Sequence, residues 1–160
     1  MNCGIGFQTI AINNSTQDPD TAALLNANCA QAANLRNQIG FTAGQLNVYY
    51  LNNPGARGWW CGNNTIIIGA TADNESLAHE FGHALSLGHT NNIAGIPNTN
   101  LMVTGGTGRN SITEGQCFRC NVNPGSTLNA NGIRTEPTRN CPDGTTNNTC
   151  PDLALDVTPE

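Results

Sequence analysis

The chain of 160 residues is long enough to form one domain around a hydrophobic core. Only 11% of its residues are charged, the net charge is -5, and all six cationic residues are arginines. No basic block can neutralise phosphates and no apolar run is long enough to span a bilayer, so nucleic acids and membranes are not expected as partners, and we expect a monomer.

Seven cysteines in a chain of this length indicate an oxidising compartment, so we expect a secreted protein whose disulfides supplement the core. The odd number leaves at least one thiol unpaired in a monomer. Cys117, Cys120, Cys141 and Cys150 could alternatively form a four-thiolate zinc site. The wide gap between the last two cysteines is atypical of zinc sites built from tight pairs, which favours disulfides.

The first half of the chain predicts alternating strands and helices. Residues Ile5 to Ile12 alternate imperfectly between apolar and polar and predict a strand. Asp18-Pro19 favours the start of a helix, an apolar stripe continues from Leu24 to Ile39, and Gly40 ends it. The apolar and aromatic run from Leu46 to Leu51 predicts a buried strand.

A hairpin is expected next, with one strand at Gly58 to Cys61 and the other at Thr65 to Gly69. The intervening Gly62-Asn63-Asn64 is typical of a tight turn. Thr71 to Glu75 then supplies capping side chains and an acidic first turn for a following helix.

That following helix carries the candidate chemistry. Its sequence His79-Glu80-x-x-His83 places two imidazoles four residues apart, so they can converge on one metal ion with Glu80 beside it. Leu77 and Phe81 lie on the opposite, apolar face, which we expect to pack against the core. One face of the helix is therefore expected to pack against the core, and the other is expected to bind a metal ion.

His89 is the only other histidine of the chain. On a continued helix it would lie roughly 15 Å beyond His79, too far to share a metal ion. The chain must therefore turn before His89, and Gly88 is the predicted C-terminal stop of the helix. Three neutral imidazoles leave one position open on Zn²⁺, as in catalytic zinc sites, and calcium is not indicated.

The stretch from His79 to His89 resembles the HExxHxxGxxH signature of the metzincin clan of zinc peptidases, and it is most similar to that of the matrixins. The resemblance implies a single α+β catalytic domain with a zincin-like fold. Residues 1–89 would form an upper subdomain with a small mixed twisted sheet and two main helices. Residues 90–160 would form an irregular lower subdomain with a methionine turn, a C-terminal helix and a cysteine-tied tail.

Ser86 departs from the signature, because it stands where the family has the glycine of the turn. A serine in the left-handed conformation costs about 1 kcal/mol more than a glycine. We therefore expect that Ser86 adopts a strained left-handed conformation or that Gly88 makes the bend instead.

The resemblance also assigns roles outside the motif. Met102 matches the methionine that forms a hydrophobic base under the zinc ligands. Trp59, Trp60 and Cys61 match an antiparallel edge strand that pairs with an extended polypeptide substrate. The alternative for the two tryptophans is that both simply pack in the core.

The last part of the chain contains one predicted helix. Ser111-Ile112-Thr113-Glu114 matches a capping box, and the helix that follows would end before Asn123-Pro124. The segment from Gly125 to Glu160 is polar and rich in turn residues, which predicts an irregular tail.

By this resemblance the protein would be a secreted zinc endopeptidase that hydrolyses peptide bonds with a zinc-activated water and Glu80 as the general base. Two alternatives remain open at this point. One is a catalytically silent zinc-binding or adhesion module on the same scaffold, and the other is a zinc amidase that acts on non-peptide substrates.

Overall fold

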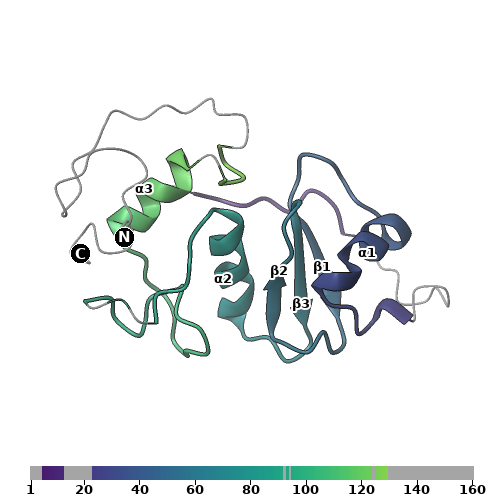
Figure 1. The fold of residues 1–160 in the computed structure, drawn as a ribbon, viewed down its shortest axis with the longest axis horizontal. Coiled ribbons are helices and arrows are strands. Elements are labelled where there is room, and N and C mark those ends of the chain that lie inside the picture. Colours follow the sequence, from purple (N-terminus) through teal and green to yellow (C-terminus); the bar gives the residue numbers. More distant parts are fainter. Residues whose placement is uncertain (1–4, 13–22, 92, 94, 124, 130–160) are drawn as a thin grey trace. The chain divides into compact units, whose positions relative to one another are not determined.

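A computed structural model describes residues 5–12, 23–91, 93, 95–123 and 125–129 (Figure 1). Over these residues the protein is a mixed α+β structure with one small sheet and few helices. The chain divides into two compact units between Glu80 and Phe81, within the single helix α2 (Asn74–Ala84). No described helix is long and apolar enough to cross a membrane.

The first unit contains a three-stranded sheet in the order β1-β3-β2. Strand β1 (Asn47–Leu51) runs parallel to β3 (Thr65–Gly69), and β2 (Gly58–Trp60) is antiparallel to it. Every residue of the central strand β3 is buried, as expected for a strand with neighbours on both sides and three consecutive isoleucines.

The predicted hairpin is confirmed by the pairing of β2 with β3. The turn closes with a hydrogen bond from the amide of Thr65 to the carbonyl of Gly62 at 3.0 Å. Asn63 and Asn64 have φ values of 46° and 54°. Asparagine tolerates this left-handed region better than most residues, and positive φ at two successive positions matches the twist of a tight hairpin.

Helix α1 (Ala32–Ile39) is shorter than the sequence predicts. The 3₁₀ turn η2 (Cys29–Gln31) precedes it, and Asn28 caps that turn by accepting from the amide of Ala30 at 2.9 Å. The asparagine side chain competes for backbone donors, so regular helix begins only after it. The predicted start at Asp18-Pro19 lies outside the described residues, whereas Gly40, with φ 119°, ends the helix as expected.

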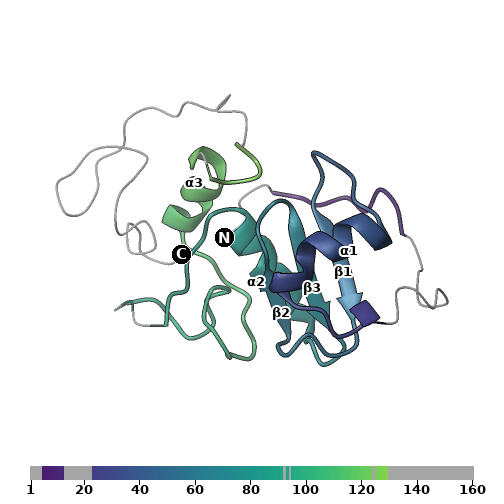
Figure 2. The same cartoon turned by 45° about the vertical axis from the view of Figure 1, so that its right-hand side comes forward.

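The core of this unit lies where α1 packs against β1 and β3 (Figure 2). The disulfide between Cys29 and Cys61 joins η2 to the residue after β2 and borders this core. The buried cluster consists of Leu24, Ala27, Leu35, Tyr49, Leu51 and Ile67.

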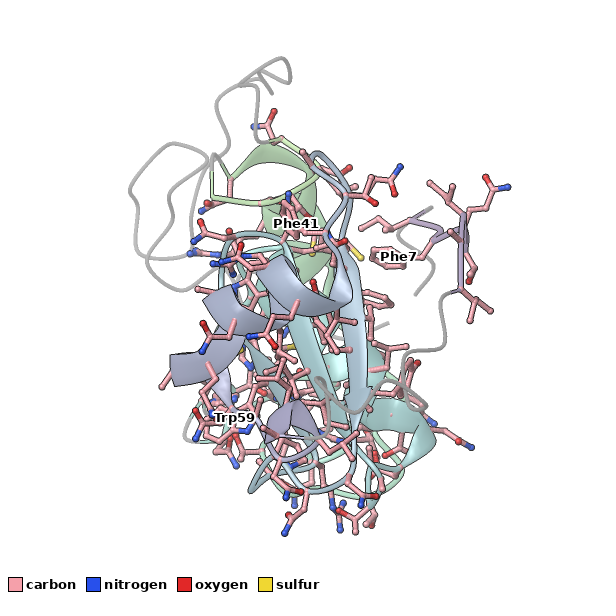
Figure 3. All side chains as sticks on the ribbon, turned by 90° about the vertical axis from the view of Figure 1, so that its right-hand side faces the viewer. Phe7, Phe41 and Trp59 are labelled. Carbon is pink, nitrogen blue, oxygen red and sulfur yellow. A yellow bond between two sulfur atoms is a disulfide. The ribbon has the colours of Figure 1, made fainter. Side chains whose placement is uncertain are left out.

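The prediction of a strand over residues 5–12 is wrong, because this segment forms neither strand nor helix. Ile10 and Ile12 are 70% and 88% exposed, and Phe7 is also exposed (Figure 3). An alternating pattern specifies a strand only where one face becomes buried, and here the apolar side chains face solvent.

The second unit begins with the last turn of α2 and continues through a long connection to α3 (Glu114–Val122), and the described residues of this connection form no helix or strand. The predicted capping box is displaced by two residues. Thr113, in an extended conformation, accepts from the amide of Gln116, whose side chain accepts from the amide of Thr113. Of the predicted tail, residues 130–160 lie outside the described residues.

Removal of the disulfide should test its contribution to the first unit. The two cysteines are 32 residues apart, so the double substitution Cys29→Ala with Cys61→Ala should lower the free energy of unfolding by about 3.5 kcal/mol through the entropy of the unfolded chain. Urea unfolding followed by circular dichroism measures this difference. A change below about 1 kcal/mol would contradict the assigned role.

Candidate metal centre

The start of helix α2 is held by Asp73. Its backbone carbonyl accepts from the amide of Ser76 at 3.1 Å, and its carboxylate accepts from the hydroxyl of Ser76 at 2.6 Å. Arg57 forms a salt bridge with the same carboxylate at 2.7 Å. These contacts hold the first turn of the helix, which lies one turn before His79.

The three histidines converge. His79 and His83 lie one turn apart on α2, and one ring nitrogen from each of these and from His89 lies within 4.8 Å of the others. The Nε2 atoms of His83 and His89 are 3.0 Å apart, and their rings meet edge to face. Two nitrogens bound at ~2.05 Å to a tetrahedral zinc ion would be about 3.3 Å apart, so small side-chain rotations would suffice for coordination.

His83 is oriented by the backbone that follows the helix. Its Nδ1 donates to the carbonyl of Leu87 at 2.8 Å, and because a carbonyl only accepts, the lone pair lies on Nε2. Burial lowers the pKa of His83 below its ordinary value of 6.5, although the hydrogen bond to Leu87 raises it, and the neighbouring His89 lowers it further. A neutral imidazole with a free Nε2 is the form that binds a metal ion.

Helix α2 ends in a Schellman motif with a serine in the left-handed position. Ser86 has φ 69°, its amide donates to the carbonyl of His83 at 2.9 Å, and the amide of Leu87 donates to the carbonyl of Gly82 at 2.9 Å. The bend predicted before His89 is therefore made by Ser86. Gly88, the predicted stop, is exposed and has no left-handed φ, because the helix has already ended.

Glu80 is 6% exposed and lies against the first residue of β2. A Cβ on Gly58 would come within 2.8 Å of the Glu80 Cγ and 2.9 Å of its Oε1. Separations this short do not occur between real atoms of this kind, so only glycine leaves room for the observed carboxylate. The sequence did not identify Gly58 as part of the site, because the need for a glycine there comes from the side chain of Glu80, 22 positions away.

Of the predicted substrate-strand residues, two belong to β2 and Cys61 lies directly after it. Among the described strands β2 pairs only with β3, so it is an edge strand. Trp59 is 40% exposed, with its ring nitrogen donating to the carbonyl of Pro54 at 3.2 Å, and Trp60 is half-buried (Figure 3). The two tryptophans are thus not both core residues.

Met102 is fully buried against the last turns of α2. A Cβ on Gly82 would collide with the Met102 Sδ and come within 3.1 Å of its Cε. The thioether therefore packs directly on the helix backbone, one residue before His83. The methionine and the histidine-bearing helix are thereby packed together.

A buried amide pair that the sequence did not indicate supports this methionine. The Nδ2 of Asn100 donates to the Oε1 of Gln116 at 2.8 Å, and the Nε2 of Gln116 donates back to the Oδ1 of Asn100 at 3.1 Å. The same Oδ1 accepts from the amide of Met102 at 3.0 Å and the hydroxyl of Thr90 at 3.2 Å. One side chain thus joins α3, the methionine and the residue after His89.

The alternative four-thiolate zinc site is not supported. Cys117 is disulfide-bonded, and burial raises the pKa of the free Cys120 thiol to about 12. Because its sulfur is in a disulfide, Cys117 cannot supply a thiolate ligand, and the set of four is incomplete. Cys141 and Cys150 lie outside the described residues.

Comparison of the chain with protein-family models, with curated proteins and with solved structures found no match. What the site can bind is therefore argued from the positions of its three histidines and of Glu80.

Substitution of Asn100 tests the buried amide pair. Asn100→Ala leaves the Met102 amide, the Thr90 hydroxyl and both polar atoms of Gln116 short of a partner, so the free energy of unfolding should fall by about 3 kcal/mol. Asn91→Ala is the matched control, because exposed Asn91 makes two hydrogen bonds to Thr104 that water can replace. Equal losses for the two variants would contradict the role of Asn100.

Proposed function

We propose that this protein is a secreted zinc endopeptidase of the metzincin type. The observation that carries the proposal is the convergence of His79, His83 and His89, with one nitrogen of each within 4.8 Å of the others, next in sequence to the buried carboxylate of Glu80. The left-handed turn at Ser86 and the buried Met102 beneath the helix also support it, because the family signature calls for both features.

The donor set fits zinc. Imidazoles suit a divalent transition metal, and three of them leave a position open for water or substrate. Zinc held in this way supplies a Lewis acid that polarises a carbonyl and makes water acidic near neutral pH. The chain's own contribution is to bring three imidazoles together and to fix the tautomer of His83 through the carbonyl of Leu87.

Glu80 is the proposed general base. It follows His79 directly on α2, and its carboxylate is held in a confined place against Gly58. It would take a proton from the attacking water on one carboxylate oxygen and deliver that proton to the leaving amine. A purely structural zinc site would have no use for an open position or for such a base, which favours an enzyme over a silent module.

The proposed substrate is a polypeptide in an extended conformation. Strand β2 offers an outer edge that is unpaired among the described strands, and its first residue touches Glu80. A peptide that added to this edge would be held by main-chain hydrogen bonds, with few demands on its side chains. The exposed ring of Trp59 would offer such a peptide an apolar surface.

A secreted location is supported by the oxidised cysteines. The Cys29 to Cys61 disulfide and the disulfide-bonded Cys117 are typical of proteins in oxidising compartments.

The role of Glu80 can be tested with Glu80→Gln, which keeps the shape of the side chain and removes its basicity. This variant should bind one zinc ion per chain like the wild type and should lose at least ~10²-fold in the rate of cleaving an unfolded protein. Metal content and chelator-sensitive cleavage are measured on the same samples. Cleavage at the wild-type rate by the variant would exclude Glu80 as the base.

Two other outcomes would identify the alternatives. Zinc binding without cleavage by the wild type would favour a silent zinc-binding or adhesion module. Zinc-dependent hydrolysis of small amides, with no cleavage of polypeptides, would favour a zinc amidase.

The contact of Gly58 with Glu80 yields a second prediction. Gly58→Ala should push the carboxylate aside and lower the cleavage rate by about 10-fold or more, because small misplacements of catalytic groups have large effects. Zinc content should not change. Gly6→Ala is the control, since a Cβ there meets nothing within 4 Å and its φ is not left-handed. Wild-type cleavage by the Gly58 variant would contradict this placement of Glu80.

A further inference from the structure

We infer that Arg119 is a positioning residue of the metal centre, which acts through the backbone of Ser86. Its Nε donates to the carbonyl of Ser86 at 2.6 Å, and it comes from helix α3, far along the chain from the histidines. The inference rests on the metal site of the proposed function and not on peptide hydrolysis.

Ser86 needs an external restraint. With φ 69° it adopts a left-handed conformation that is less favourable for a serine than for a glycine. Without compensation, the chain between His83 and His89 would gain from leaving this conformation. Any such rearrangement would change the direction in which the chain approaches His89.

The peptide group between Ser86 and Leu87 is held at both ends. Its carbonyl accepts from Arg119 and its amide donates to the carbonyl of Gly82 at 2.9 Å. A rotation of this peptide would break both hydrogen bonds at once. The two hydrogen bonds therefore hold Ser86 at a positive φ, against the preference of a serine for negative φ.

The next carbonyl along the chain orients a metal ligand. The carbonyl of Leu87 accepts from Nδ1 of His83 at 2.8 Å, and the other ring nitrogen, Nε2, lies 3.0 Å from Nε2 of His89. Arg119 is thus connected to the histidine through the Ser86 carbonyl and the residue that follows it. Groups that hydrogen-bond to metal-binding histidines in this way tune metal affinity.

The surroundings of the turn suit a serine. A Cβ on Gly125 would come within 2.9 Å of the Ser86 Oγ, so glycine at position 125 leaves space for the hydroxyl. Helix α3, which carries Arg119, is anchored by the buried side chain of Gln116. Both contacts come from sequence positions well beyond the histidine motif.

The cationic charge of Arg119 near the end of α2 offers a competing explanation, because cations stabilise helix C-termini. Two substitutions separate the explanations. Arg119→Gln removes the charge but places an amide N–H where Nε stood, whereas Arg119→Met ends in a methyl group at that position and has no donor.

The experiment measures zinc affinity by competition with a chromophoric chelator, using the whole chain. Arg119→Met should bind zinc about 10-fold more weakly than the wild type, the lower end of the range for direct partners of metal-binding histidines, because Arg119 acts through the neighbouring peptide group. Arg119→Gln should remain within about threefold of the wild type, because the hydrogen bond persists. Ser86→Gly combined with Arg119→Met should bind zinc about fivefold more tightly than Arg119→Met alone, because glycine adopts the left-handed turn without strain.

Cobalt substitution supplies a second readout. The visible absorption of bound Co²⁺ depends on ligand geometry, so its bands should shift in Arg119→Met and return in the double variant. Circular dichroism checks that every variant is folded, and the double variant keeps the test valid if Arg119→Met alone is unstable. This spectrum would not respond to a loss of global stability alone.

Three results would overturn the inference. Wild-type zinc affinity in Arg119→Met would show that Arg119 has no role in the metal centre. Equal losses of affinity in the Gln and Met variants would assign the effect to the charge of Arg119. No recovery of affinity by Ser86→Gly would show that Arg119 does not act through the turn. A wild-type protein that binds no zinc would instead overturn the metal centre and the proposed function with it. The two failures are therefore distinguishable.

Discussion

The reversal of the chain at Ser86 is the constraint on which the candidate site depends. Two histidines four residues apart share a helix face without assistance, but the third can join them only if the helix stops and turns back. The Schellman hydrogen bonds to Gly82 and His83 make this turn, and they use the same residues that carry the site. The same turn therefore ends the helix and brings the third histidine to the other two.

The second unit supports this turn through side chains that are polar and buried. Asn100 connects the backbone of Met102, the hydroxyl of Thr90 and helix α3 through Gln116. A buried amide with all partners in place fixes a single arrangement, because each alternative leaves donors or acceptors unpaired at a cost of about 1 to 3 kcal/mol per group. The described connection between α2 and α3 can in this way hold its residues in defined positions without helix or strand.

The sequence predicted the features that depend on short-range rules. Hairpin geometry, the stop at Gly40 and the turn before His89 each follow from the preferences of a few neighbouring residues. The predicted strand over residues 5–12 was wrong because neither face of this segment is buried. The predicted first helix is regular only over Ala32–Ile39, because the cap at Asn28 delays its start. Gly58, Gln116 and Arg119 could not be identified, since each acts on a residue 16 to 33 positions away.

The serine at position 86 shows how a left-handed turn can form without a glycine. A glycine would adopt the left-handed conformation unaided, whereas Ser86 does so with its carbonyl bonded to Arg119 and its hydroxyl beside Gly125. Contacts with residues elsewhere in the chain thus hold the serine in a conformation that it does not favour by itself. A glycine at the turn is therefore a weaker criterion for a three-histidine site than a turn that brings the third histidine close to the other two.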